Sequence, residues 1–360
     1  MNITFLIGNG FDLRMGMKTR FTDMYEGYIA QDSATDAIRK FKKMLEADAP
    51  NYKTWGDFEM AMAQKANLFS EEFEFIECLR DFKLYMVEHL RKEQDFFFGR
   101  KQISEEAHTY CRDAFAKSIE HFYVGLSPNT INTFIDLGLK SKQNYQFVSF
   151  NYTTVFDNFI KTTDAWWGGC DVLHIHGSLD ADIVLGADNL DQISKLPYMT
   201  TRRFERAFIK PQFNKSFDAN RLSRAEQAID NSDIICIYGM SLGRSDYSWT
   251  KRLKEWLLSS PDNHLVYFVY DNRKFNKQNW DEIMDEEDDR IATLLGRICD
   301  ASEEMSKLFG QIHIPVVYDL FGIDEILTNE KLKVDEANTR KEEILKRLAG
   351  RPQELGISGR

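Results

Sequence analysis

The chain has 360 residues, of which 43% are hydrophobic and 13% aromatic, so it can bury the core of a globular protein and disorder is not expected. Its 57 Asp and Glu residues outnumber its 46 Lys and Arg residues, and the net charge of -11 would repel phosphate backbones and anionic lipid. The composition therefore argues against a protein that binds nucleic acid over a broad surface.

The cysteines and the N-terminus indicate the compartment. The chain contains five widely spaced cysteines: Cys78, Cys111, Cys170, Cys236 and Cys299. No pair has C-x-x-C spacing, so the sequence predicts neither a structural zinc site nor a secreted disulfide framework. The first residues lack the basic region and cleavage site of a signal peptide, and no apolar run approaches the roughly 20 residues of a membrane span. We therefore expect a cytoplasmic protein without membrane contact.

Six short apolar or β-branched runs recur along the chain, and each is a candidate strand. They lie at residues 3–7, 145–150, 171–176, 233–238, 264–270 and 313–319. Nearly continuous hydrophobicity is typical of strands that are buried on both faces of a parallel sheet. Helical stretches, such as residues 221–231 and 247–258, separate most of these runs. The alternation predicts an α/β fold with a doubly wound parallel sheet.

A long helical insertion is predicted between the first two strands, over residues 35–140. A stripe of apolar residues at spacings of three and four indicates an amphipathic helix; its members are Phe73, Ile76, Leu79, Phe82, Met86 and Leu90. A second stripe comprises Ala107, Cys111, Phe115, Ile119 and Phe122. The insertion could form a lid over a site, or it could support the core or an oligomer contact.

The remaining boundaries follow from this insertion. Residues 1–34 and 141–325 form the predicted nucleotide-binding core, and residues 326–360 form a C-terminal helix that ends near Gly350 and Pro352, followed by a mobile tail. The acidic stretch at residues 281–290 is interpreted as a solvated helix start or loop rather than a metal site.

The first candidate site is the glycine turn Gly8-Asn9-Gly10, which directly follows the first strand. Such a turn, leading into a helix, lets backbone N–H groups approach a phosphate without obstruction by side chains. The spacing is not G-x-G-x-x-G, because the next glycine is Gly16. Asp12 follows the turn, where it could also cap the first helix.

Two further candidates follow the second and third strands. Asn151 stands at the carboxyl end of the second strand, where open α/β sheets bind their ligands, although it could be a simple strand-end cap. His174 and His176 are two residues apart and should face the same side of the third strand, with Gly177 permitting close approach. We favour His174 as a core histidine and His176 as a functional residue.

The last candidate follows the fourth strand. Gly239 ends this strand, and the chain passes through Ser241 and Asp246 into the next predicted helix. Asp246 is interpreted primarily as the cap of the helix that begins at Tyr247.

These segments together resemble a known family. "FLIGNGFDLRMGMKT", "WGDFE", "FNYTTVFDN", "HIHGS" and "YGMSLGRSD" occur in this order and are similar to motifs of the AbiH-like bacteriophage abortive-infection family. That family in turn looks like a distant branch of the sirtuin fold, so the resemblance implies a sirtuin-like Rossmann core.

The sirtuin resemblance can be followed along the chain. Gly8, Gly10 and Gly16 keep the glycine spacing of the sirtuin cofactor turn, with Asn9 in place of alanine and Asp12 in place of serine. Asn151 matches the asparagine of sirtuins, whereas Thr153 stands where an acid is usual. The pair His176-Gly177 matches the catalytic histidine and its glycine, and Gly239-Met240-Ser241 is similar to a glycine-threonine-serine turn that contacts the cofactor.

The resemblance implies a chemistry that does not need zinc. Sirtuin deacetylases hold zinc with two C-x-x-C pairs, which this chain lacks, so protein deacetylation is not expected. Sirtuin-like defence effectors cleave NAD to nicotinamide and ADP-ribose. In that reaction Asn151 would hold the ribose hydroxyls or the attacking water, and His176 would accept a proton.

The other candidate residues would bind the cofactor. By the same resemblance, the N–H groups of the Gly8-Asn9-Gly10 turn would hold the pyrophosphate, and Gly239 and Ser241 would contact the adenosine. Asp12 would bind the nicotinamide carboxamide or fix the turn. The resemblance also allows a homo-oligomer and activation by a phage component.

Three alternatives remain at this stage. The protein could be a sensor that binds NAD or ADP-ribose without cleaving it, which the missing acid at Thr153 favours. It could be a metal-dependent nuclease that uses Asp12, Glu59 and Asp246, although the acidic composition offers no nucleic-acid footprint. A hydride-transfer dehydrogenase is ranked lowest because the glycine spacing differs.

Overall fold

The structure is a computed structural model, and it describes residues 1–48, 55–99, 105–163, 167–271, 273, 275, 276 and 278–321. The predicted C-terminal helix and tail at residues 326–360 lie outside the described residues. The strands are β1 (Asn2–Ile7), β2 (Asn144–Ser149), β3 (Val172–His174), β4 (Ile234–Tyr238), β5 (His264–Phe268) and β6 (Ile312–His313).

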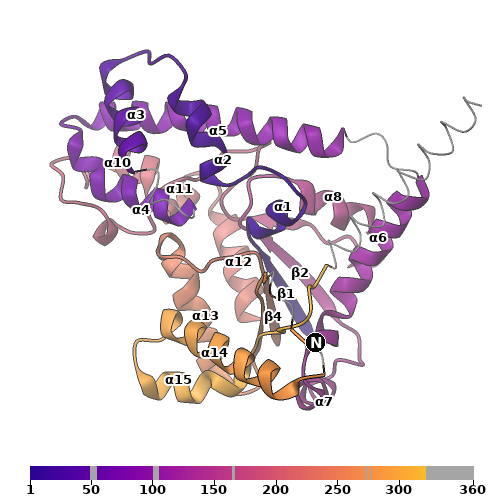
Figure 1. Cartoon of the computed structure of the whole chain (residues 1–360). Helices are drawn as coiled ribbons and strands as arrows, with labels where there is room; N and C mark the ends of the chain where they lie inside the picture. Colours follow the sequence, from indigo (N-terminus) through magenta and orange to yellow (C-terminus); the bar gives the residue numbers. More distant parts are fainter. Residues whose placement is uncertain are drawn as a thin grey trace, which may run out of the picture.

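These strands form one parallel sheet of six strands in the order β3-β2-β1-β4-β5-β6 (Figure 1). The doubly wound α/β fold predicted from the sequence is therefore confirmed, and every strand overlaps one of the six predicted runs. From β1 the chain adds β2 and β3 on one side, and it then adds β4, β5 and β6 on the other side, so the switch point of the sheet lies between β1 and β4. Open α/β sheets bind their ligands at the carboxyl ends of the strands beside such a switch point.

The helices fill the connections between the strands. They are α1 (Gly10–Arg14), α2 (Phe21–Ile29), α3 (Asp36–Asp48), α4 (Trp55–Lys65), α5 (Glu72–Phe98), α6 (Glu105–Glu120), α7 (Pro128–Asp136), α8 (Val155–Thr162), α10 (Arg202–Phe208), α11 (Lys210–Phe217), α12 (Ala219–Asp230), α13 (Tyr247–Ser259), α14 (Trp280–Ile298) and α15 (Ser302–Leu308). None of the described helices is long and apolar enough to cross a membrane.

The sheet is covered on both faces, which explains the continuous apolar runs of its strands. Helices α6, α7 and α8 pack on one face, where Phe5 contacts an aromatic cluster, and α12 to α15 pack on the other face (Figure 1). All residues of β4 and β5 are buried. The acidic stretch at residues 281–290 lies in the first half of α14, as expected for a solvated helix start.

A third group of helices lies above the carboxyl ends of the strands (Figure 1). Its core joins α2 to α5 with residues 179–209, whereas the later helices of the 35–140 segment belong to the core of the sheet. We call this group the helical layer and define it as α2 to α5 together with α10. The segment at 35–140 is thus divided between two cores.

The predicted stripe on α5 is buried except at its first position. Phe73 is 57% exposed, because Phe75 takes the inward position and contacts the rings of Phe204 and Phe208 at 5.5 and 5.0 Å. In the second stripe Phe115, Ile119 and Phe122 are buried, whereas the side chains of Ala107 and Cys111 lie outside the described residues.

Candidate functional site

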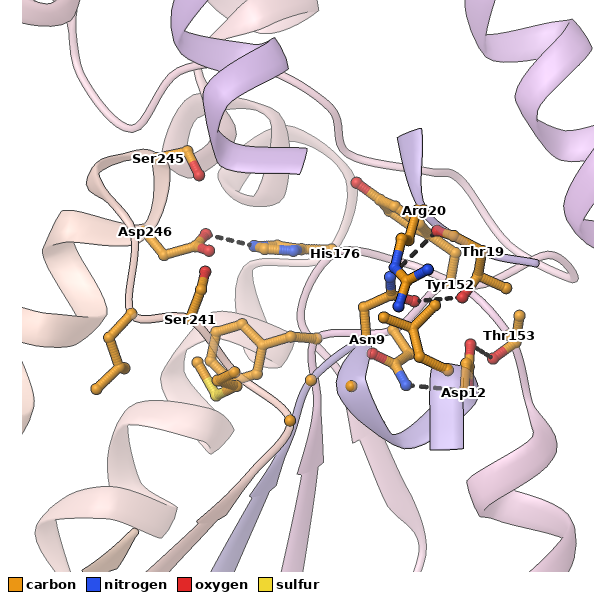
Figure 2. Close-up of a pocket in the computed structure, with 18 of the residues that line it drawn as sticks. Asn9, Asp12, Thr19, Arg20, Tyr152, Thr153, His176, Ser241, Ser245 and Asp246 are labelled. Carbon is orange, nitrogen blue, oxygen red and sulfur yellow. Dashed lines mark hydrogen bonds and ion pairs between the residues drawn. The ribbon is translucent and has the colours of Figure 1, made fainter. Parts of the chain in front are cut away.

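A cavity of about 340 Å³ lies at the switch point between β1 and β4 (Figure 2). Its walls come from the segments that follow β1, β2, β3, β4 and β5, and Glu59 and Leu90 of the helical layer complete them. Of the predicted site residues, the cavity is lined by Gly8, Asn9, Gly10, Asp12, Asn151, His176, Gly239 and Ser241. The fold therefore brings together residues that are up to about 230 positions apart in the sequence, because parallel strands end at one edge.

Gly177 is the predicted site residue that does not line the cavity. It forms a tight turn with a φ of +75°, and a Cβ atom at this position would lie 1.8 Å from the carbonyl oxygen of Asp182. The turn that follows His176 therefore requires a glycine at this position.

The glycines of the first turn serve a close contact between two loops. The N–H groups of Gly8 and Gly10 donate to the carbonyl oxygens of Tyr238 and Gly239, at 2.8 and 2.9 Å. A Cβ atom at Gly8 would lie 2.5 Å from the carbonyl oxygen of Gly239, and one at Gly10 would lie 2.5 Å from its Cα atom. The expectation that the N–H groups of Gly8 and Gly10 hold a pyrophosphate is therefore wrong, because both are used to join the ends of β1 and β4.

Asn9 fixes a second loop over the cavity. Its Nδ2 donates to the carbonyl oxygen of Thr19 at 3.1 Å, and the Thr19 hydroxyl donates to its Oδ1 at 2.8 Å. These bonds hold the segment that carries Arg20, whose side chain lies in the cavity beside Thr19 (Figure 2). Sequence reasoning missed Arg20, because nothing in its local pattern indicates that it returns to the glycine turn.

Asp12 and Asn151 form a buried polar pair at the floor of the cavity. Asn151 Nδ2 donates to Asp12 Oδ1 at 3.2 Å, and the hydroxyl of Thr153 donates to Asp12 Oδ2 at 2.6 Å (Figure 2). Burial raises the pKa of Asp12 to about 7, against the lowering effect of these two hydrogen bonds. Asp12 lies within α1, whose N-cap is Asn9, so the capping role considered for Asp12 does not apply.

The other atom of the Asn151 amide has no partner. Asn151 is 3% exposed, and among the described residues nothing hydrogen-bonds to its buried Oδ1. A buried acceptor without a donor costs roughly 1–3 kcal/mol, so this oxygen indicates a place for a ligand donor.

The hydroxyl of Thr153 lies against the carboxylate of Asp12. The sequence shows a hydroxyl where a sirtuin-like protein would carry an acid, but Asp12 places a carboxylate against both Thr153 and Asn151. An acidic group is thus present beside Asn151, although it comes from a different strand end. Thr153 therefore does not favour a non-catalytic sensor.

Asp12 gives the folded protein a specific pH dependence. Its pKa rises from 3.8 to about 7 on folding, so the folded protein retains a proton that the unfolded chain has released. This stabilising contribution is fully present below the unfolded pKa and is lost as the pH rises through the folded pKa, at up to about 1.4 kcal/mol per pH unit. In Asp12→Asn we expect the free energy of unfolding to fall less steeply over this window than in the wild type.

Urea denaturation at a series of pH values measures this difference. The matched control is Asp285→Asn, which removes an exposed carboxylate from α14 and should reproduce the wild-type slope. Equal slopes in the wild type and Asp12→Asn would show that Asp12 does not titrate in this window.

The sequence predicted that His174 and His176 face the same side of the third strand, and this prediction is wrong. Strand β3 ends at His174, and the turn before Gly177 directs His176 elsewhere. His174 faces the carbonyl oxygen of Asn151 with Nδ1 and the carboxylate of Asp157 with Nε2, at 2.8 and 2.9 Å. Burial works to lower the pKa of His174, but Asp157 raises it above its ordinary value. His174 does not line the cavity, which agrees with its interpretation as a satisfied core histidine.

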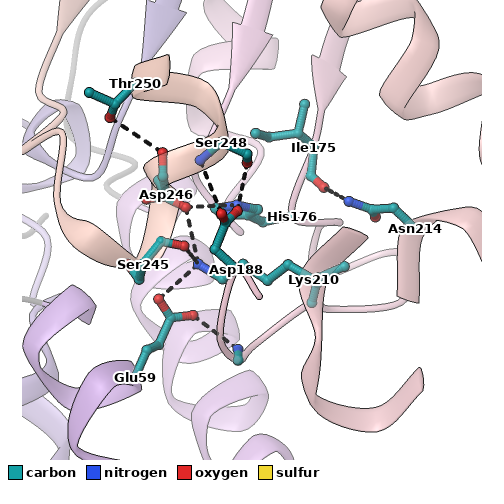
Figure 3. Close-up of polar contacts among 12 residues, drawn as sticks. Glu59, Ile175, His176, Asp188, Lys210, Asn214, Ser245, Asp246, Ser248 and Thr250 are labelled. Atoms are coloured by element: carbon teal, nitrogen blue, oxygen red, sulfur yellow. Dashed lines mark hydrogen bonds and ion pairs between the residues drawn. The ribbon is translucent and has the colours of Figure 1, made fainter. Parts of the chain in front are cut away.

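His176 belongs to a buried group of charges (Figures 2 and 3). Its Nε2 lies 3.3 Å from Asp246 Oδ1, and the same oxygen lies 3.1 Å from Lys210 Nζ. Lys210 Nζ also lies 2.8 Å from Glu59 Oε2. Burial works to raise the pKa of Asp246, but Lys210 and His176 hold it well below its usual value.

The prediction that Asp246 caps α13 is wrong. Asp246 occupies the N-cap position, but its side chain makes no capping hydrogen bond. Asp188 performs this role from 60 residues away, because its carboxylate accepts from the backbone N–H and the hydroxyl of Ser248 at 3.1 and 2.6 Å (Figure 3). The carboxylate of Asp246 is therefore available to His176 and Lys210.

The carboxylates considered for a nuclease are not arranged around a metal site. Glu59 and Asp246 share the ammonium of Lys210, and Asp12 is held by Asn151 and Thr153. Across the residues that the structure describes, no group of three or more His, Cys, Asp or Glu side chains could hold a metal ion. The sequence missed Lys210, which has no local signal beyond a lysine before a proline.

A comparison with known proteins identifies the family to which the chain belongs. Residues 4–268 match the family described as bacteriophage abortive infection AbiH, and a search of curated proteins found no match. The matched region begins in β1 and ends with β5, so it contains nearly every segment that lines the cavity. Because it covers well over half of the chain, the protein belongs to the AbiH family of bacteriophage abortive infection proteins.

Proposed function

We propose that this protein defends bacteria against phage by cleaving NAD to nicotinamide and ADP-ribose in the cavity at the switch point. Membership of an abortive infection family supports a reaction that stops the growth of an infected cell. The strand order and the position of the cavity support a dinucleotide ligand, since such sheets bind dinucleotides across this point. The likeness to sirtuins in the order Gly8, Asn151, His176 and Gly239 supports NAD as that dinucleotide.

The unpartnered oxygen of Asn151 is the observation that carries the proposal. A ribose hydroxyl is a donor that could satisfy this buried acceptor, and the bond from Nδ2 to Asp12 fixes which end of the amide faces the ligand. Asn151 would hold the ribose beside His176, which lines the same cavity.

The contact between His176 and Asp246 supports a role for His176 as a general base. Its Nε2 faces Asp246, which would fix the proton on this nitrogen and leave the lone pair of Nδ1 to accept a proton. Water would attack the ribose C1′, and the electron pair of the breaking C–N bond would pass to the nicotinamide ring, which leaves neutral. The water proton would pass to Nδ1 of His176. NAD and water thus give nicotinamide, ADP-ribose and a proton.

The phosphates require a different partner from the glycine turn. The N–H groups of Gly8 and Gly10 are already bonded, and Lys210 is surrounded by its acceptors. Arg20 lies in the cavity on a loop that Asn9 holds in place, and a guanidinium suits a pyrophosphate. Ser241, at the end of β4, remains the proposed contact for the adenosine side.

The test is the release of nicotinamide when the purified full chain is incubated with NAD. We expect release by the wild type and a loss of at least about 100-fold in Asn151→Ala, because the ribose would lose the group that positions it. The matched control is Asn158→Ala, which removes an exposed asparagine from α8 and should behave as the wild type.

Two results would contradict the proposal. If the wild type released no nicotinamide while ADP-ribose still raised its melting temperature, the cavity would be a nucleotide sensor. If Asn151→Ala released nicotinamide at the wild-type rate, Asn151 would have no role in catalysis.

A further inference from the structure

Four charged or titratable side chains form an unbroken chain of contacts from the helical layer to the cavity (Figure 3). Glu59, Lys210 and His176 are buried, and Asp246 is half-buried. Glu59 lies on α4, Lys210 begins α11, and Asp246 ends a 3₁₀ turn, Arg244–Asp246, after β4. The consecutive contacts measure 2.8 Å from Glu59 Oε2 to Lys210 Nζ, 3.1 Å from Nζ to Asp246 Oδ1, and 3.3 Å from Oδ1 to His176 Nε2.

Lys210 is fully engaged at the centre of this chain. Its side chain is 5% exposed, and its Nζ donates to Glu59, to Asp246 and to the carbonyl oxygen of Ser245. An ammonium has three donors, so these three acceptors saturate it and fix its position. Burial works to lower the pKa of Lys210, but Asp246 and Glu59 raise it above its usual value, so the lysine stays charged.

Glu59 is held just as firmly from the other side. Its Oε2 accepts from Lys210, and its Oε1 accepts from the backbone N–H of Gly186 at 3.1 Å. Because both oxygens face donors, the hydrogen bonds favour the carboxylate form, while burial raises the pKa of Glu59 above its ordinary value. A protonated side chain would direct an O–H group at another donor.

Asp246 is the point at which this arrangement meets the proposed chemistry. Its Oδ1 lies between the ammonium of Lys210 and the ring of His176, and the capping of α13 is left to Asp188. The carboxylate that caps α13 belongs to Asp188, 58 positions before Asp246, although the N-cap position of Asp246 would allow it to make this hydrogen bond itself. The structure thus keeps Asp246 for His176.

We propose that Glu59 and Lys210 are positioning residues that hold the carboxylate of Asp246 against Nε2 of His176 and thereby set the orientation and the basicity of this histidine. The catalytic role of these residues rests on the proposed function. Their effect on the basicity of His176 does not require that NAD is cleaved. The inference also assigns a role to helix α4, which carries Glu59. The basicity of His176 would then depend on the position of the helical layer relative to the sheet.

The signs of the expected effects follow from the charged and titratable groups around His176. These are Asp246 at its Nε2, Lys210 and Glu59 behind Asp246, the ring of Tyr152 from the loop after β2, and Lys83 of α5 near Glu59. Glu59, Lys210 and Asp246 together carry one net negative charge. Glu59→Gln makes this group neutral and should make the protonated ring of His176 less stable, whereas Lys210→Met makes it more negative and should have the opposite effect.

Titration of the histidine rings by NMR tests the proposal without any substrate. The full chain is labelled with ¹³C-histidine, and the His176 signal is assigned by its loss in His176→Gln. We expect Glu59→Gln to lower the titration midpoint of His176 by roughly one pH unit, and Glu59→Asp to return it toward the wild type. The matched control is Glu255→Gln, which removes a carboxylate that is 61% exposed and should leave the midpoint unchanged.

A kinetic measurement separates positioning from packing. In Glu59→Gln we expect kcat for NAD cleavage to fall and the acidic limb of the pH–rate profile to move to lower pH, with KM nearly unchanged, because both carboxylate oxygens of Glu59 accept from Lys210 and Gly186 and not from the ribose proposed to bind Asn151. A merely structural role would leave the midpoint and the profile where they are.

The outcomes for the two proposals differ. A downward shift of the His176 midpoint with no nicotinamide release by the wild type would support the network and refute NAD cleavage. An unchanged midpoint in both Glu59→Gln and Asp246→Asn, whose loss of the adjacent charge should have the larger effect, would overturn the network whatever the enzyme does to NAD.

Discussion

Replacement of His176 by alanine is expected to reduce NAD cleavage by roughly 100-fold to 10,000-fold, the usual cost of losing a general base. The side chain is buried at the cavity wall, its Nε2 faces Asp246, and its ring packs edge-on against Phe150 at 5.5 Å. No other described histidine lines the cavity, so no second imidazole can take the place of His176. The measurement is kcat/KM from the release of nicotinamide over a range of NAD concentrations.

The control for this variant is His121→Ala, because His121 is half-exposed and the described contacts of its side chain are with Lys117, Glu120 and Tyr123, none of which lines the cavity. Since Asn151 and His176 would act on the same ribose, the double variant should be little worse than the poorer single variant. A His176→Ala enzyme with a rate within a few-fold of the wild type would remove His176 from the mechanism.

Replacement of Lys210 by methionine is expected to have the largest effect on stability. The change leaves the buried carboxylate of Glu59 and the half-buried carboxylate of Asp246 without their common partner, and breaking a buried ion pair in this way typically costs about 3–5 kcal/mol. We expect the free energy of unfolding at neutral pH, measured by urea denaturation, to fall by about this amount. The matched control on the same helix is Lys215→Met, an exposed position where the change should be within about 0.5 kcal/mol.

A second substitution distinguishes this cause from a loss of packing. Adding Glu59→Gln to Lys210→Met removes one of the two uncompensated charges, so the double variant should be more stable than Lys210→Met alone. If Glu59→Gln destabilises the double variant further, the cost of Lys210→Met comes from the cavity that it leaves and not from the charges.

The sheet could be predicted from the sequence because burial on both faces leaves a local mark. Each strand appears as a short apolar run, and parallel strands place their carboxyl ends together. Asn151, His176 and the glycine turn therefore meet at one edge, although they are far apart along the chain. The ends of the strands were less predictable, since β3 is stopped by the turn at Gly177 and not by any loss of hydrophobicity.

The details of the site depend on partners that no local pattern reveals. The N–H groups of the first turn are taken by carbonyls at the end of β4, a neighbour that only the strand order defines. Asp246 has the sequence position of a helix cap, but Asp188 arrives from a distant loop and replaces it. Lys210 shows its importance only when its three acceptors are known.

The strand order also has a consequence for how the protein is made. The first strand to leave the ribosome, β1, lies at the centre of the sheet, and its two neighbours are residues 144–149 and 234–238. At about 5–20 residues per second, roughly 10–50 s of translation separate β1 from its second partner. The cavity cannot close before residues 239–246 have been added, because Gly239, Ser241 and Asp246 form its wall. A nascent chain that ends before residue 270 therefore lacks part of the cavity wall, and the wall is complete once about three quarters of the 360 residues have been added.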